Sequence, residues 1–204
     1  MKQLQVLGGL LDDGSVWRMR ALAERGITAA TVQRAVAAGL VEQVSRGVYR
    51  SALVARVPDQ DLAELMARVP GGLVCLHTAA SLHGLGDVTA ARTWVALPVG
   101  RRVPSIEWPP AKFVRWSRPA LFSVGVERRV IAGVPIDLTN PPRTVVDMLA
   151  RMGMVGEDRA YACLRDYVSS GQRVAALTEI ASAVGWLSKV GSHLRSAAAF
   201  EGPR

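Results

Sequence analysis

Gln33 and Arg34, which share a helix face with small residues, have the side-chain types and the spacing needed to contact DNA bases. Gln33 and Arg34 lie with Ala30 on one face of a predicted helix over residues 29–38, and Thr31 lies at the margin of that face. A small polar face can approach the major groove closely, where an amide pairs with adenine and a guanidinium with guanine or phosphate. We expect a recognition helix here, although every amphipathic helix also has a solvated face.

Contacts with the DNA backbone are expected on either side of this face. Thr28 precedes the helix as a candidate N-cap, where free amides and the helix dipole favour a phosphate. Arg46 lies in a predicted turn further along the chain, and Arg50 lies in the strand after it. Both arginines are expected to contact the backbone or the minor groove.

Arg143 and Asp147 are a second pair of polar residues whose spacing suggests a specific role. They stand four residues apart in a predicted helix, so they can form an ion pair on one face. Asn140 is a plausible N-cap for this helix, with proline in the first turn after it. The pair either anchors the helix to a sheet or contacts a partner protein, and the sequence leaves both roles open.

No pattern in the sequence indicates catalysis or metal binding. Cys75 and Cys163 have neither zinc spacing nor a redox partner, so we predict two buried thiols. Cys75 with His77 and His83 is too sparse a pattern for a metal site. The sequence lacks a Walker loop, a dinucleotide-binding glycine motif, a kinase-type catalytic loop and a nucleophile elbow. We therefore assign no catalytic residue, no metal and no cofactor.

Three short helices are predicted to position the DNA-reading residues. They are expected over residues 3–11, 16–25 and 29–38. Ser15 is a candidate N-cap for the second helix. Only Gly26, Ile27 and Thr28 separate the second helix from the third, which is typical of a helix-turn-helix. The third helix is expected to bury an apolar stripe made of Ala29, Val32, Ala35 and Val36.

A β-hairpin is predicted directly after the third helix. Residues 40–44 and 48–50 have strand patterns, and Ser45-Arg46-Gly47 forms the turn between them. A hairpin in this position is a wing, with Arg46 at its tip. The order of the elements therefore predicts a winged helix-turn-helix DNA-binding domain over residues 1–56.

The remaining residues, 57–204, are predicted to form a mixed α/β domain with a small sheet and C-terminal helices. Its strands are expected over residues 93–97, 112–116 and 124–138, the last run turning at Ala132-Gly133. Its helices are expected over residues 61–68, up to Gly84 or Gly86, and over 144–152, 157–169 and 173–187. The fold class is therefore α+β.

The net charge of +8 is unevenly distributed along the chain. Residues 1–56 have eight basic and four acidic side chains, and residues 92–129 have eight basic and two acidic ones. Clustered positive charge favours a polyanion, although the excess of arginine over lysine can also reflect codon usage. The basic block 92–129 is expected to extend the DNA footprint, to meet an acidic protein, or to meet an RNA.

Composition favours a globular chain, because half of the residues are hydrophobic and about a fifth are charged. The N-terminal residues lack the apolar run and cleavage site of a signal peptide. The longest apolar run, residues 174–187, is interrupted by Glu179 and is too short to span a bilayer. We therefore expect a cytoplasmic protein without a membrane partner.

Three stretches of the sequence resemble AbiEi-type antitoxins. The first covers residues 26–28, 34–41 and 44–49, and its Arg46-Gly47-Val48-Tyr49 end is a recurrent signature of the family's N-terminal domain. Residues 79–85 are similar to an alanine-rich helix that ends near a histidine and a glycine. Residues 142–149 are similar to a Pro-x-Arg-Thr-Val-Val-Asp-Leu-Leu motif of the family, which includes Arg143 and Asp147.

The resemblance implies an antitoxin that neutralises a nucleotidyltransferase-like toxin and represses their shared operon. Its implied partners are promoter DNA, with inverted repeats as the expected operator, and the toxin, reached directly or functionally. Two alternatives stay open. One is an atypical phosphotransferase, a protein kinase that inactivates the toxin covalently, and the other is a plain transcriptional regulator.

Overall fold

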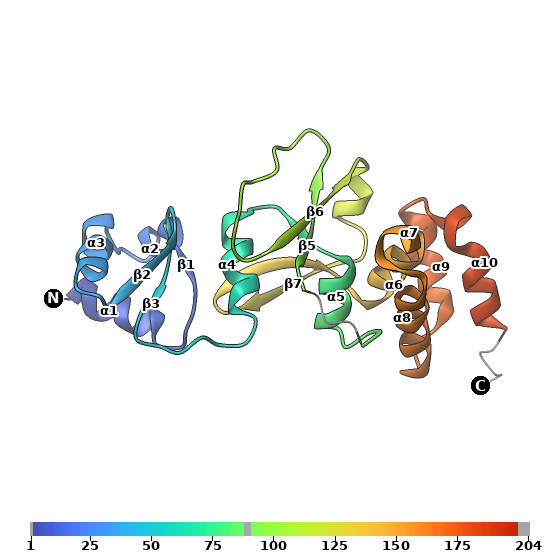
Figure 1. Cartoon of the computed structure of the whole chain (residues 1–204), viewed down its shortest axis with the longest axis horizontal. Helices are drawn as coiled ribbons and strands as arrows, with labels where there is room; N and C mark the ends of the chain where they lie inside the picture. The colour runs from blue at the N-terminus through green and yellow to red at the C-terminus, as the bar shows by residue number, and fades with distance from the viewer. Residues whose placement is uncertain (1, 88–90, 200–204) are drawn as a thin grey trace. The chain divides into compact units, whose positions relative to one another are not determined.

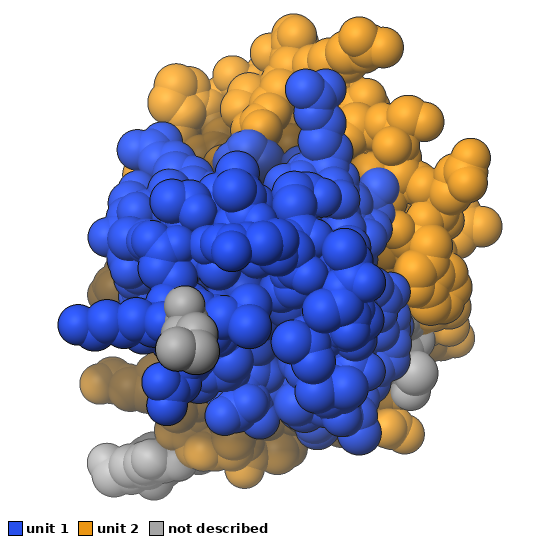
Figure 2. Space-filling model, turned by 90° about the vertical axis from the view of Figure 1, so that its left-hand side faces the viewer, with its two compact units in different colours: residues 1–70, 129–136 blue, residues 71–128, 137–204 orange. Residues whose placement is uncertain are grey.

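The computed structural model describes residues 2–87 and 91–199 of the 204-residue chain. The chain divides into two compact units, coloured separately in Figure 2. The N-terminal unit contains residues 1–70 and 129–136, and the C-terminal unit contains residues 71–128 and 137–204. The N-terminal unit thus includes residues beyond 56, where the sequence suggested a boundary.

The N-terminal unit combines three helices with a small antiparallel sheet (Figure 1). The helices are α1 (Lys2–Leu11), α2 (Met19–Ala23) and α3 (Ala29–Ala37). The strands are β1 (Trp17–Arg18), β2 (Val41–Ser45) and β3 (Val48–Ser51), in the order β1-β3-β2. A further helix, α4 (Gln60–Arg68), follows β3 in this unit. Helices α1, α2 and α3 and strands β2 and β3 share one core, made of Leu7, Leu11, Leu22, Ile27, Val32, Ala35, Val41 and Tyr49.

The prediction of a second helix over residues 16–25 is wrong in its first turn. Trp17 and Arg18 form β1, which pairs with Tyr49 and Val48 of β3, so α2 begins only at Met19. Ser15 is buried and caps no helix; its backbone N–H donates to the Asp13 carboxylate. The strand partner comes from a segment thirty residues later in the chain, so local sequence patterns could not reveal it.

The C-terminal unit is built on a mixed five-stranded sheet with the order β6-β5-β4-β8-β7. The strands are β4 (Leu73–Val74), β5 (Thr93–Pro98), β6 (Ala111–Trp116), β7 (Val126–Ile131) and β8 (Val134–Thr139), the last two joined by the predicted hairpin. The tip of this hairpin, residues 129–136, belongs to the N-terminal unit. Strand β5 runs antiparallel to β4 and parallel to β6, and β4 runs parallel to β8.

Helices supply the rest of the C-terminal unit. They are α5 (Leu76–Leu82), α6 (Pro141–Ala150), α7 (Met152–Val155), α8 (Glu157–Ser169), α9 (Val174–Ala183) and α10 (Leu187–Ala198), with a 3₁₀ turn at Pro119–Phe122. They pack on one core with the sheet residues Trp94, Ala96, Val114 and Trp116. The predicted α+β class is confirmed for the part of the chain that the structure describes.

The prediction of one helix over residues 173–187 is wrong. Helix α9 ends at Ala183 and a separate helix, α10, begins at Leu187. Gly185 adopts φ +68°, a left-handed conformation that ends a helix and that glycine adopts without strain. The backbone N–H of Trp186 then donates to the carbonyl of Ala181 at 2.7 Å, which closes the helix end.

Candidate nucleic-acid interface

The connection between α2 and α3 has the geometry of a helix-turn-helix turn. Gly26 adopts φ +78°, which explains why glycine stands after α2. Ile27 is buried in the core of the N-terminal unit, and its N–H donates to the Leu22 carbonyl at 3.0 Å. Because α2 ends at Ala23, five residues, 24–28, connect it to α3, two more than the sequence predicted.

Thr28 caps α3, as the sequence predicted. Its hydroxyl accepts a hydrogen bond from the N–H of Thr31 at 3.3 Å. Thr28, Ala29 and Ala30 are exposed, so the first turn of α3 and the positive end of its dipole face solvent. This end of the helix can receive an anion such as a DNA phosphate.

The two faces of α3 differ from the prediction at two positions. Val32 and Ala35 are buried as expected, but Ala29 is exposed and takes no part in the apolar stripe. Thr31, placed by the sequence at the edge of the DNA-reading face, is only 1% exposed. Its hydroxyl lies inward because it forms hydrogen bonds with Gln3 on α1 and with Arg34 on α3.

Gln3 joins α1 to the turn before α3 and to α3 itself, a role that the sequence did not predict. Its side-chain N–H donates to the carbonyl of Gly26 at 2.9 Å. Its carbonyl oxygen accepts from the hydroxyl of Thr31 at 2.6 Å and from that of Thr28 at 3.3 Å. A glutamine on an exposed helix position carries no sequence signal for contacts with residues more than twenty positions away.

Arg34 and Gln33 remain at the surface, as a DNA-reading face requires. Both are exposed. Arg34 extends along the helix toward its N-terminus, where it donates to the Thr31 hydroxyl at 3.2 Å and to the Ala30 carbonyl at 3.3 Å. The hydrogen bonds of Gln3, Thr31 and Arg34 therefore form one chain, which limits the orientations open to the Arg34 guanidinium.

A hairpin follows α3, in the position of a wing. Strands β2 and β3 pair antiparallel, and Arg46 and Gly47 form the two-residue turn between them. Gly47 has φ +73°, which this tight turn needs. Arg46 is exposed at the tip.

Arg50 has a different setting from Arg46. Its side chain is 13% exposed and forms ion pairs with Glu42 on β2 and Glu64 on α4. Glu64 is 1% exposed and lies 3.6 Å from Arg50 Nε and 3.6 Å from Arg56 Nη2. Burial raises the pKa of Glu64, while the two guanidiniums oppose the rise. The Arg50 side chain is thus engaged in holding β3 to α4.

Arg143 and Asp147 lie inside the C-terminal unit and are both fully buried. Arg143 Nε donates to Asp147 Oδ1 at 2.7 Å, and its other nitrogens donate to the carbonyls of Val124 and Leu121. The guanidinium also lies 5.1 Å from the centre of the Trp116 ring. Burial raises the pKa of Asp147 to about 6 despite its neighbouring arginine. This geometry ties α6 to the segment before β7 and offers no surface to a partner.

The described residues contain no group of three or more His, Cys, Asp or Glu side chains placed to hold a metal ion. Cys75 and Cys163 are buried free thiols, and burial raises the pKa of both. His83 Nε2 is hydrogen-bonded to the carbonyl of Thr139 at 2.7 Å, and the His77 ring lies tilted against the Trp94 ring, with 5.0 Å between their centres. None of the helices in the described ranges is long and apolar enough to cross a membrane.

Comparisons with known proteins agree with the architecture of the N-terminal region. Residues 13–52 match the family model described as "Transcriptional regulator, AbiEi antitoxin". No curated protein matches the chain. Among solved structures, the RV2827C protein from Mycobacterium tuberculosis is similar, with a TM-score of 0.58 and 16% identity, over 98% of this chain and 80% of that chain. At that identity the likeness concerns the fold alone.

Proposed function

We propose that the chain is a DNA-binding antitoxin that represses its own promoter, because residues 13–52 match the family model of the AbiEi transcriptional regulators. One observation carries the DNA-binding part of this proposal. The N-terminal turn and polar face of α3 are exposed, and the Arg46 turn follows in the position of a wing. Anion-binding amides, base-reading side chains and a basic hairpin tip then belong to one small domain.

In the proposed complex, α3 enters the major groove. The amides of Ala29 and Ala30 and the Thr28 hydroxyl bind a phosphate, Gln33 pairs with an adenine, and Arg34 pairs with a guanine or a phosphate. Arg46 contacts the backbone or the minor groove beside this site. Thr31 and Arg50, engaged inside the unit, support Arg34 and the hairpin instead of contacting DNA.

The operator expected for such a domain is an inverted repeat. Two copies bound to opposite half-sites place their recognition helices in successive major grooves, about 34 Å apart along the duplex. The second role is neutralisation of a nucleotidyltransferase-like toxin, which we assign to the C-terminal unit.

A gel-shift titration on the fragment upstream of the gene tests the DNA surface. We expect the Arg34→Ala/Arg46→Ala double variant to bind at least about 100-fold more weakly, since each contact contributes about 1–3 kcal/mol. Arg173→Ala, an exposed arginine of the C-terminal unit, is the control and should bind as the wild type does. Wild-type affinity in the double variant would show that DNA binds elsewhere.

A further inference from the structure

We propose that Tyr49, on the second strand of the hairpin, makes Gln33 select adenine over guanine at one position of the operator. This role rests on the DNA binding proposed above, because it concerns the base that α3 contacts. Tyr49 is a positioning residue. It acts on the DNA only through the side chain of Gln33.

A hydrogen bond joins the recognition helix to the hairpin. The side-chain nitrogen of Gln33, Nε2, donates to the hydroxyl oxygen of Tyr49 at 3.5 Å. This distance is at the long end of the range for such a bond, so the bond orients the amide more than it stabilises the fold. Gln33 is exposed on α3, so the rest of its amide group can reach a base in the major groove.

Tyr49 is fixed in place, as a positioning residue must be. It is 4% exposed and lies in the core that also contains Val32 and Ala35 of α3. Its strand, β3, is the central strand of the small sheet, where Tyr49 pairs with Trp17 on one side and with Gln43 on the other. Packing in the core requires only the ring, and the hydroxyl has a partner in Gln33.

The hairpin that carries Tyr49 is anchored at both ends. In the turn, the Gly47 carbonyl accepts a hydrogen bond from the N–H of Met19 at the start of α2, at 2.8 Å. At the open end, the N–H of Ala52 donates to the carbonyl of Leu40 at 3.1 Å. The Tyr49 hydroxyl therefore keeps its place beside α3 when the tip of the hairpin contacts DNA.

The bond to Tyr49 changes what the Gln33 amide can offer to a base. A free glutamine amide has two N–H donors and one carbonyl acceptor, and Tyr49 engages one of the donors. Adenine presents one acceptor and one donor to the major groove, whereas guanine presents two acceptors. The remaining N–H and carbonyl of Gln33 match adenine. A guanine would instead place one of its acceptors against the Gln33 carbonyl.

The two side chains that contact bases are thus held by different elements. Arg34 is held from α1 through Gln3 and Thr31, whereas Gln33 is held from the hairpin by Tyr49. A guanidinium has only donors, so its partner affects its orientation alone. An amide has donors and an acceptor, so its partner also decides which base it fits. The hairpin therefore contributes to sequence specificity as well as to backbone contact.

Competition gel shifts with operator duplexes that differ at one base pair test this role. Each adenine of a half-site is replaced in turn by guanine. The pair that Gln33 contacts is the position where the wild type prefers adenine at least about 10-fold and Gln33→Ala does not. At that position we expect Tyr49→Phe to prefer adenine by less than about 3-fold, chiefly because it binds the guanine duplex more tightly than the wild type does.

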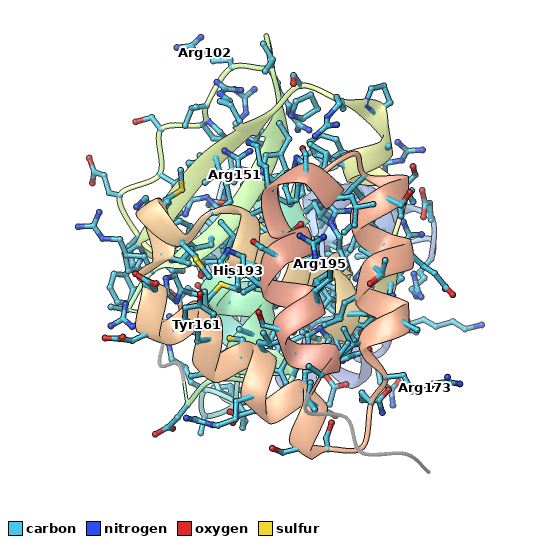
Figure 3. All side chains as sticks on the ribbon, turned by 90° about the vertical axis from the view of Figure 1, so that its right-hand side faces the viewer. Arg102, Arg151, Tyr161, Arg173, His193 and Arg195 are labelled. Carbon is cyan, nitrogen blue, oxygen red and sulfur yellow. The ribbon has the colours of Figure 1, made fainter. Side chains whose placement is uncertain are left out.

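Tyr161→Phe is the matched control in the C-terminal unit. The Tyr161 hydroxyl is hydrogen-bonded to His193 Nδ1 of α10 at 2.9 Å (Figure 3), and its loss should leave the adenine preference unchanged. In a Gln33→Ala background, Tyr49→Phe should cause no further change in preference. Partial unfolding lowers the affinity for both duplexes by the same factor, so the ratio of the two affinities distinguishes positioning from a loss of stability.

An adenine preference in Tyr49→Phe equal to that of the wild type would overturn the proposal and leave promoter binding in place. So would a Gln33→Ala variant that keeps the wild-type preference at every position, because Gln33 then contacts no base. Failure of the wild-type chain to bind its promoter is a separate result. It would refute the proposed repression and, with it, this role of Tyr49.

Discussion

At the scale of single residues, Gln3 illustrates how a side chain outside the recognition helix can control it. It bonds to Gly26, Thr28 and Thr31, and Thr31 in turn holds Arg34. We expect Gln3→Ala to weaken promoter binding about 10-fold, because the Arg34 guanidinium gains orientations that it must lose on binding. Gln5→Ala, on an exposed position of the same helix, is the matched control. Equal gel-shift affinities for the two variants would contradict the positioning role.

The buried Asp147 leads to a prediction about pH. Its pKa is about 6 in the folded protein, above the ordinary value of 3.8, because burial opposes the charged form. The folded state therefore binds more protons than the unfolded state between these values, and this carboxyl's contribution to the free energy of unfolding falls as pH rises from about 4 to 6. Above pH 6 the contribution is constant.

Urea unfolding across this pH range measures the effect. Asp147→Asn removes the titrating group, so the difference between wild type and variant should change between pH 4 and 6 and then level off. The stability of the wild type relative to the variant should be highest near pH 4 and lowest above pH 6, because only the wild-type carboxyl must ionise inside the protein as pH rises. A pH-independent difference would show that Asp147 does not titrate in this range.

At the scale of elements, two glycines of the N-terminal unit should respond in opposite directions. Gly26→Ala places a side chain at φ +78° in the turn before α3 and should lower the free energy of unfolding by about 1 kcal/mol. Gly9→Ala lies in α1, where an added Cβ meets nothing within 4 Å, and should raise it by up to about 1 kcal/mol. Thermal melting of both variants measures these changes. A change of the free energy of unfolding in the same direction in both variants would contradict this account of the turn.

At the scale of the whole molecule, the two proposed activities belong to different units and should be separable. The Arg34→Ala/Arg46→Ala variant should lose promoter repression yet still protect cells that express the toxin, because neither residue lies in the C-terminal unit. A reporter fused to the promoter and a growth assay measure the two activities in the same strain. Loss of protection in this folded variant would show that the recognition helix also serves neutralisation.

The salt dependence of promoter affinity tests how the basic residues of this chain, whose net charge is +8, contribute to DNA binding. The logarithm of the promoter affinity should fall linearly with the logarithm of salt concentration as bound counterions are released. Replacing Arg46 by alanine should reduce the magnitude of that slope by about 1, because one phosphate contact is lost. An unchanged slope would place Arg46 away from the backbone.

The sequence by itself determined the features that depend on near neighbours in the chain. Thr28 caps α3 and Asn140 caps α6, since a cap is settled within three residues, and Arg143 pairs with Asp147 one helical turn away. The hairpin after α3 also follows from local strand patterns and a glycine turn. These local signals were sufficient to predict a helix-turn-helix.

Only the tertiary structure decided which polar residues are engaged inside the protein and which stay at the surface. Thr31 points to Gln3, and Arg50 binds Glu64, although neither partner lies nearby in the sequence. The same holds for β1, whose pairing with β3 shortens α2. Burial and ion pairing depend on segments that meet only after folding, so no periodicity along the chain could have separated Arg46 from Arg50.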